Sequence, residues 1–173
     1  MAIINEEEGK TVKTYPKPIP FVPKNIDRYI GNPHNIISRS SWETKFMRWC
    51  DTNPAIIKWN SEDVVIPYYS KSDQKMRKYY MDFFVYYRTA DGKTKKIIVE
   101  IKPYNQTIPP KKRGRKKLET FLNEQKTYQV NKDKWMSADS YAKANGFEFI
   151  IMTEYELYPE YARKGRPIPK NAK

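Results

Sequence analysis

Three ionisable side chains in apolar surroundings, Asp82, Glu100 and Lys102, form the clearest candidate for a chemical site in this sequence. Asp82 lies in an aromatic run. Glu100 and Lys102 lie in a β-branched run that follows it, after a polar turn at Asp91-Gly92. Two such runs around an Asp-Gly turn predict a β-hairpin, here from 78 to 103. A carboxylate in an apolar strand is costly unless it is paired or binds a metal, so the pattern indicates a functional site.

The register of this hairpin decides whether the three side chains meet. Glu100 and Lys102 are two residues apart in a strand, so both leave the same face. A loop of three residues, Ala90-Asp91-Gly92, pairs Asp82 with Glu100. A loop of only Asp91-Gly92 pairs Asp82 with Ile101 instead and puts the two carboxylates on opposite faces. A joint site therefore requires an odd loop or a compensating bulge.

Facing carboxylates repel each other unless a cation lies between them. Oxygen ligands suit Mg²⁺ or Mn²⁺, with water and a substrate phosphate completing the coordination shell. An adjacent lysine can orient an attacking water or neutralise charge that develops on the phosphate. This combination predicts metal-assisted phosphodiester hydrolysis. The alternative is a solvated strand face carrying Glu100 and Lys102, with Asp82 in a salt bridge at a sheet edge.

Glu43 is a further candidate ligand, because it lies at the start of a predicted helix that precedes the sheet. The segment Ser40-Ser41-Trp42-Glu43 also matches a capping box, in which Ser40 is the N-cap and Glu43 reaches back to it. Both interpretations stay open from the sequence.

The composition indicates a folded domain with a polyanionic partner. The 173 residues carry a formal net charge of +13, which favours nucleic acid, although a basic soluble protein or an anionic-membrane binder is an alternative. Aromatic residues make up 14% of the chain, too many for a disordered protein. No apolar run reaches 18 residues, so we expect no membrane span. One cysteine, Cys50, and one histidine, His34, exclude an intrachain disulfide, a cysteine-rich zinc site and nucleases built on paired histidines.

The order of predicted elements indicates an α/β fold with a mixed central β-sheet. A helix to about residue 51 precedes short strands at 55–59 and 64–69. The hairpin follows, and then come a long helix at 118–144, which admits a break near Asn131, and a last strand at 147–152. We expect a proline-rich extended N-terminal arm at 1–35, a nuclease domain at 36–158 and a basic C-terminal tail at 159–173.

A basic loop precedes the long helix and is a candidate for contacts with a DNA backbone. The alternative is a solvated loop without a ligand. Its basic residues are Lys111, Lys112, Arg113, Arg115, Lys116 and Lys117.

Asp82 followed by Glu100-Ile101-Lys102 resembles the PD-(D/E)xK nuclease signature. With the segment at 40–43, it is similar to the TnsA-type endonuclease subgroup and, within it, to the head completion nucleases of T-even-like tailed phages. The resemblance extends over roughly residues 25–157. It departs from the signature at Met81, where a proline usually precedes the aspartate.

The resemblance implies a restriction-endonuclease-like core, a mixed sheet flanked by helices, and Mg²⁺-dependent DNA cleavage in which Mn²⁺ can substitute. By position, it makes Asp82 and Glu100 metal ligands together with the carbonyl of Ile101. It makes Lys102 the catalytic lysine and Glu43 a helix-borne acid. It also implies an auxiliary role for polar residues on the long helix, namely Gln125 and Lys126.

The resemblance further implies double-stranded DNA as the substrate and phage portal or head-neck proteins as partners. The expected location is the cytoplasm of the infected bacterial host or the virion, without a membrane association. Two other functions stay open: a non-catalytic DNA-binding structural protein of the phage head or neck, and, less favoured, a transposase subunit. A transposase subunit would need a C-terminal partner-binding domain that we do not find in this sequence.

Overall fold

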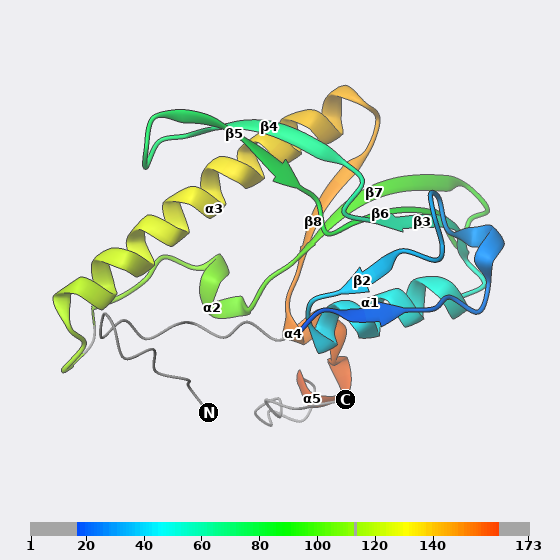
Figure 1. Ribbon diagram of the computed structural model, residues 1–173, viewed down its shortest axis with the longest axis horizontal. Helices are drawn as coiled ribbons and strands as arrows, with labels where there is room; N and C mark the ends of the chain where they lie inside the picture. The colour runs from blue at the N-terminus through cyan, green and yellow to red at the C-terminus, as the bar shows by residue number, and fades with distance from the viewer. Residues whose placement is uncertain (1–16, 113, 163–173) are drawn as a thin grey trace.

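A four-stranded mixed sheet forms the centre of the molecule (Figure 1). The computed structural model describes residues 17–112 and 114–162. The strand order is β3-β6-β7-β8, in which the pairs β3–β6 and β6–β7 are antiparallel and the pair β7–β8 is parallel. A parallel neighbour requires a long crossover connection, which the helix α3 supplies. The strands are β3 Ile56–Ser61, β6 Phe83–Arg88, β7 Thr94–Ile101 and β8 Glu148–Met152.

The β6–β7 hairpin has the register that unites the two carboxylates. Phe83 pairs with Val99, so the next position along the ladder places Asp82 opposite Glu100. The loop holds three residues, because the Thr89 N–H donates to the Lys93 carbonyl at 2.8 Å. Within it, Gly92 adopts a φ of 81°, which a side chain would oppose. A tight turn followed by a left-handed glycine is a common three-residue hairpin loop.

The prediction of one continuous strand from Lys78 to Tyr87 is wrong. Residues up to Tyr80 belong to β5 (Lys75–Tyr80), which pairs with β4 (Val65–Ser70) in a separate two-stranded sheet. The chain changes sheets at Met81, whose side chain is fully buried and whose N–H donates to the Val64 carbonyl at 2.9 Å. Asp82 therefore lies between two strands and not within one.

Helices cover both faces of the central sheet, as the sequence predicts. The first core contains Val99 of β7 with Phe46 of α1 (Ser41–Thr52). The second core contains Ile98 with Tyr79 of β5 and Ala138 of α3. Alternation along β7 thus sends odd-numbered residues toward α1 and even-numbered residues toward α3. Glu100 shares the parity of Ile98 and leaves the sheet on the α3 side.

The helix α3 (Leu118–Ala144) is continuous, so the break that the sequence admits near Asn131 does not occur. Asn131 is 6% exposed within it. Gly146 follows the helix with a φ of 69°, and the Phe147 N–H donates to the Ala142 carbonyl at 2.8 Å. This closure ends the helix and turns the chain into β8. Figure 1 shows the N-terminal half of α3 projecting away from the sheet, with α2 (Tyr104–Thr107) beside it.

Residues 17–35 of the predicted arm lie along the domain. They contain β1 (Ile19–Phe21), which pairs with β2 (Ile36–Ser38), and the short helix η1 (Ile26–Arg28). The carboxylate of buried Asp51 accepts hydrogen bonds from the Lys24 N–H at 2.7 Å and the Asn25 N–H at 3.0 Å. The C-terminal helices are α4 (Glu154–Leu157) and α5 (Pro159–Ala162). Residues 1–16 and most of the predicted tail, 163–173, lie outside the described residues. No helix in the described part of the chain is both long and apolar enough to span a membrane.

Candidate active site

Glu100 and Lys102 lie at the end of β7 and form a close ion pair. The distance from Lys102 Nζ to Glu100 Oε1 is 2.8 Å. The Lys102 N–H donates to the Met152 carbonyl at 2.9 Å, so strand geometry continues to Lys102 and keeps both side chains on one face. The Glu100 side chain is 2% exposed and the Lys102 side chain 26%. The alternative of a solvated strand face is therefore wrong.

Asp82 joins this pair from the position directly before β6. Its Oδ2 accepts a hydrogen bond of 2.7 Å from the Ile101 N–H. The Asp82 carboxylate thus accepts a hydrogen bond from the main chain of β7, just beyond the last residue pair of the β6–β7 ladder. This bond holds Asp82 against the end of β7, next to Glu100.

The electrostatics of the group are those of two carboxylates competing for one cation. Burial raises the pKa of Asp82 well above its usual range, and the charge of Glu100 raises it further. Lys102 and the Ile101 N–H oppose this shift. Burial disfavours the charged form of Lys102, but Glu100 and Asp82 outweigh it, so the pKa of Lys102 is raised. Lys102 therefore stays protonated at neutral pH, one positive charge beside two acidic groups.

The oxygen atoms of this group fit a divalent cation. Glu100 Oε2 is buried and makes no hydrogen bond of standard geometry among the described residues, although the Tyr79 hydroxyl lies near enough to interact with the Glu100 carboxylate. A buried carboxylate oxygen without such a hydrogen bond is costly and calls for a ligand. No group of three or more histidine, cysteine or acidic residues in the described ranges could hold a metal. The two carboxylates would therefore need a main-chain carbonyl, water and substrate oxygens as further ligands, which Mg²⁺ accepts readily.

Ser40 is the N-cap of α1, as the sequence predicts, but Glu43 reaches back to the Ser40 hydroxyl and not to its main-chain N–H, so the capping box is incomplete. The Glu43 N–H donates to Ser40 Oγ at 3.1 Å, and the Ser40 hydroxyl donates to Glu43 Oε1 at 2.9 Å. Glu43 Oε2 accepts from the Arg39 N–H at 2.8 Å. The charge of Glu43 also reaches the site, where it adds a smaller contribution to the raised pKa of Asp82 after burial and Glu100. A part for Glu43 in metal binding stays a prediction.

The structure adds Tyr79 and Lys134, which we did not single out as site residues from the sequence. Tyr79 of β5 is 3% exposed; burial raises the pKa of its hydroxyl, and the charge of nearby Glu100 raises it further. Lys134 of α3 lies with its Nζ 5.1 Å from the centre of the Tyr79 ring. Burial and the charge of Lys102 lower the pKa of Lys134, and Glu100 and Asp82 offset part of that effect. Lys134 is thus a second lysine that interacts electrostatically with the site.

A sequence signal for Lys134 exists in retrospect. It lies three residues after Asn131 and four before Ala138, both of which are buried. Residues at these spacings share one helix face, so a lysine there points toward the interior. The predicted auxiliary residues Gln125 and Lys126 are exposed on α3 and make no hydrogen bond or ion pair with Asp82 or Glu100 in the described structure. Lys134 lies about 13 Å farther along the helix than Gln125.

The basic loop lies between α2 and α3 and is largely exposed. Lys116 is half-buried and pairs with Glu124 of α3, with 2.7 Å between Nζ and Oε2. Arg113 lies outside the described residues. The exposed basic residues are Lys111, Lys112, Arg115 and Lys117. Their role in DNA binding stays a prediction.

The mixed sheet, its flanking helices and the carboxylate–lysine group at the end of β7 define an endonuclease-like domain. Residues 53–154 match the family model of the TnsA-like endonuclease N-terminal domain, and the chain belongs to this family. The chain is also similar to the head completion nuclease of Enterobacteria phage T4, with 42% identity over 137 residues. That alignment covers 78% of this chain and 89% of the phage T4 protein. No solved structure matches the chain.

Proposed function

We propose that this protein is a Mg²⁺-dependent DNA endonuclease that hydrolyses phosphodiester bonds during phage head completion or packaging. The observation that carries the proposal is the group of Asp82, Glu100 and Lys102 gathered at the end of β7, with the Glu100 carboxylate buried. Membership of the TnsA-like endonuclease family and the similarity to a head completion nuclease support it.

In this mechanism Asp82, Glu100 and the carbonyl of Ile101 would hold the metal, and Mn²⁺ would be able to replace Mg²⁺. When bound, Mg²⁺ supplies a Lewis acid that polarises the scissile phosphate and lowers the pKa of a coordinated water. Lys102 keeps its proton, because the adjacent carboxylates raise its pKa. Its ammonium group orients the attacking water and stabilises the charge that develops on the phosphate oxygens. Lys134 is a second lysine that interacts electrostatically with the site, from the α3 side.

The substrate in this proposal is double-stranded DNA. The net charge of +13 and the basic loop before α3 provide backbone contacts that depend little on sequence. Gln125 and Lys126 extend this surface along α3. We further propose that the protein acts in the infected host, on DNA that is being or has been packaged, in contact with portal or head-neck proteins.

A plasmid cleavage assay tests the proposal. Wild type, Asp82→Asn and Lys102→Ala are incubated with linear and circular plasmid in Mg²⁺, in Mn²⁺ and in EDTA. We expect wild type to cut in either metal and both variants to lose activity by about 10²-fold or more, the usual cost of removing such a group. Lys95→Ala is the matched control, since Lys95 lies on the same strand but pairs with Glu148 at the sheet surface.

The outcomes separate the proposal from its alternative. If wild type leaves DNA intact in both metals yet binds it, the protein is a structural DNA-binding protein with a nuclease fold. If wild type and both variants cut equally, the active site lies elsewhere in the chain.

A further inference from the structure

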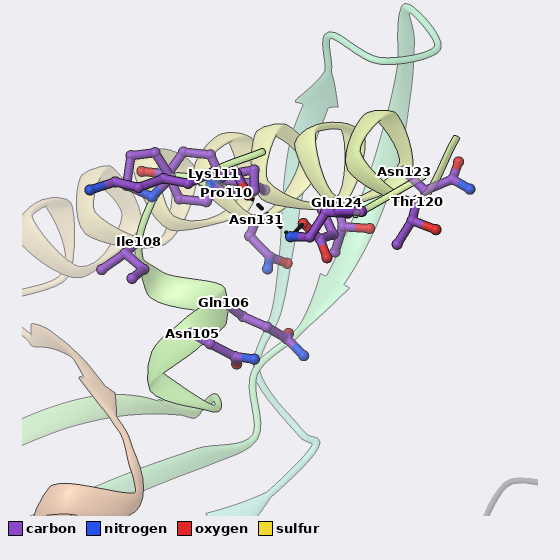
Figure 2. Close-up of a pocket in the computed structure, with 13 residues that line it drawn as sticks. Asn105, Gln106, Ile108, Pro110, Lys111, Thr120, Asn123, Glu124 and Asn131 are labelled. Carbon is purple, nitrogen blue, oxygen red and sulfur yellow. Dashed lines mark hydrogen bonds and ion pairs between the residues drawn. The ribbon is translucent and has the colours of Figure 1, made fainter. Parts of the chain in front are cut away.

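A cavity of about 690 Å³ lies between α2, the basic loop and the N-terminal half of α3 (Figure 2). This volume lies within the range of small-molecule binding pockets. The proposed mechanism does not use it. Its polar wall includes Asn105, Gln106, Thr120, Asn123, Thr127 and Asn131.

The chemistry of the wall fits a nucleotide better than a bare phosphate. Each asparagine and glutamine amide offers both donors and an acceptor, as the edge of a base does. The wall also includes Lys111 and the ion pair of Lys116 with Glu124, so a lysine can meet the phosphate of a nucleotide while the amides meet its base. Tyr128 and Pro110 contribute apolar surface against which a ring can lie.

Asn131 provides the strongest sign that the cavity has a ligand. The residue is 6% exposed, and its Nδ2 is buried without a hydrogen-bond partner among the described residues. Figure 2 shows Asn131 leaving α3 on the side where Gln106 and Asn105 lie. A buried amide donor without a partner destabilises the free protein and becomes favourable when a ligand supplies an acceptor.

The cavity adjoins the candidate active site along two parts of the chain. Asn105 and Gln106 follow Lys102 after a short connection that ends β7. Asn131 lies on the same face of α3 as Lys134, three residues away. A strand with one phosphate at the active site can therefore place a neighbouring nucleotide in the cavity.

We propose that this cavity binds a single unpaired nucleotide next to the scissile phosphate. The inference rests on the proposed function and makes DNA that carries an unpaired segment beside a duplex the preferred substrate over a fully paired duplex. Bases within an intact duplex are stacked and paired, whereas an unpaired base at an end, gap or flap offers its edge without that cost.

The first test compares binding to two labelled DNAs by fluorescence anisotropy in EDTA, so that no cutting occurs. One DNA is a blunt duplex, and the other is the same duplex with a single-stranded overhang. We expect wild type to bind the overhang DNA about tenfold more tightly than the blunt duplex, since one base bound in the cavity contributes roughly that factor in affinity. Thr127→Glu, which puts a carboxylate into the cavity, should abolish the difference. Ser140→Glu adds the same charge at an exposed position of α3 outside the cavity and should preserve it.

The second test uses Asn131→Leu, which has nearly the same shape and lacks the amide. Because the Asn131 Nδ2 has no partner in the described structure, the variant should melt at or above the temperature of wild type. It should lose the preference for the overhang DNA and keep its affinity for the blunt duplex. A lower melting temperature with equal losses on both DNAs would make Asn131 a structural residue and overturn the proposal.

The plasmid assay separates this inference from the proposed function. If wild type cuts plasmid in Mg²⁺ but binds both DNAs equally, the cavity does not hold an unpaired nucleotide, while the nuclease assignment stands. If wild type prefers the overhang DNA but cuts neither that DNA nor plasmid in Mg²⁺ or Mn²⁺, the cavity assignment stands and the catalytic one fails.

Discussion

Asp82→Asn should make the protein more stable and inactive at the same time. Burial and the charge of Glu100 raise the pKa of Asp82, so ionised Asp82 destabilises the folded state at neutral pH. An asparagine has the same shape, and its oxygen can still accept the 2.7 Å hydrogen bond from the Ile101 N–H. Removing strain of this kind from an active site commonly stabilises a protein by about 1 kcal/mol. That corresponds to a rise of about 2–4 °C in Tm for a chain of this size.

The gain in stability should depend on pH with a defined sign. A carboxyl group whose pKa is higher in the folded state binds its proton more tightly there, so it favours folding at low pH. That contribution is lost as the pH rises through the raised pKa. The advantage of Asp82→Asn is therefore absent below the ordinary aspartate pKa of about 3.9 and grows above it.

Mg²⁺ should reverse the order of the two melting temperatures. A ligand present at 100 times its Kd stabilises the folded state by about 2.7 kcal/mol. Wild type gains this stabilisation, whereas Asp82→Asn has lost a metal ligand and gains far less. Wild type should thus melt below the variant in EDTA and above it in saturating Mg²⁺.

Thermal unfolding followed by circular dichroism, from pH 4 to 8 with and without Mg²⁺, measures these differences. Asp91→Asn is the control, since hydrogen bonds from Thr89 and Lys93 lower the pKa of exposed Asp91 and reverse the expected sign. The reasoning is refuted if Asp82→Asn melts below wild type in EDTA at neutral pH, with a difference that does not change with pH.

Three further predictions follow from other parts of the structure. Lys134→Ala should lower the cleavage rate about tenfold or more, because it removes the second lysine that interacts with the site, and Lys134→Arg should restore part of the rate. Replacing both Lys111 and Lys112 by alanine should weaken DNA binding and reduce the slope of log K against log salt by about 1 per lysine. Ser40→Ala should lower the free energy of unfolding by about 1 kcal/mol in a urea titration, since it removes the cap of α1 and one partner of Glu43.

Each of these has a distinct contrary outcome. Unchanged cleavage by Lys134→Ala at every pH from 6 to 9 would place this lysine outside the chemistry. An unchanged salt slope would mean that the loop does not touch the DNA backbone. If Ser40→Ala unfolds at the same urea concentration as wild type, the cap is not a determinant of stability, and Glu43 is available for another role.

The local sequence pattern was sufficient to predict that Glu100 and Lys102 belong to one chemical group. Alternation along a strand puts Glu100 and Lys102 on one face whatever the rest of the chain does. It also sends Val99 and Ile101 toward the opposite core, as observed. The capping interaction of Ser40 and Glu43 is likewise local, because its donors and acceptors lie within four residues.

Longer-range features depended on the folded structure. The sequence left two loop lengths open, and the hydrogen bond from the Thr89 N–H to the Lys93 carbonyl shows the three-residue loop that brings Asp82 to Glu100. The change of sheet at Met81 was not predicted, since an aromatic run continues on both sides and only the second core explains why the chain turns there.

What the sequence by itself determined is the identity of the reacting groups and the face of β7 that carries them. Lys134 and Asn131 are 32 and 29 residues from Lys102 in the chain, by their numbers. They lie near the end of β7 only because α3 crosses over the sheet between two parallel strands. The position of Lys134 and the cavity beside the site were therefore decided by tertiary packing. Periodicity along a single helix shows which face of the helix is buried, but it does not show which distant strand that face contacts.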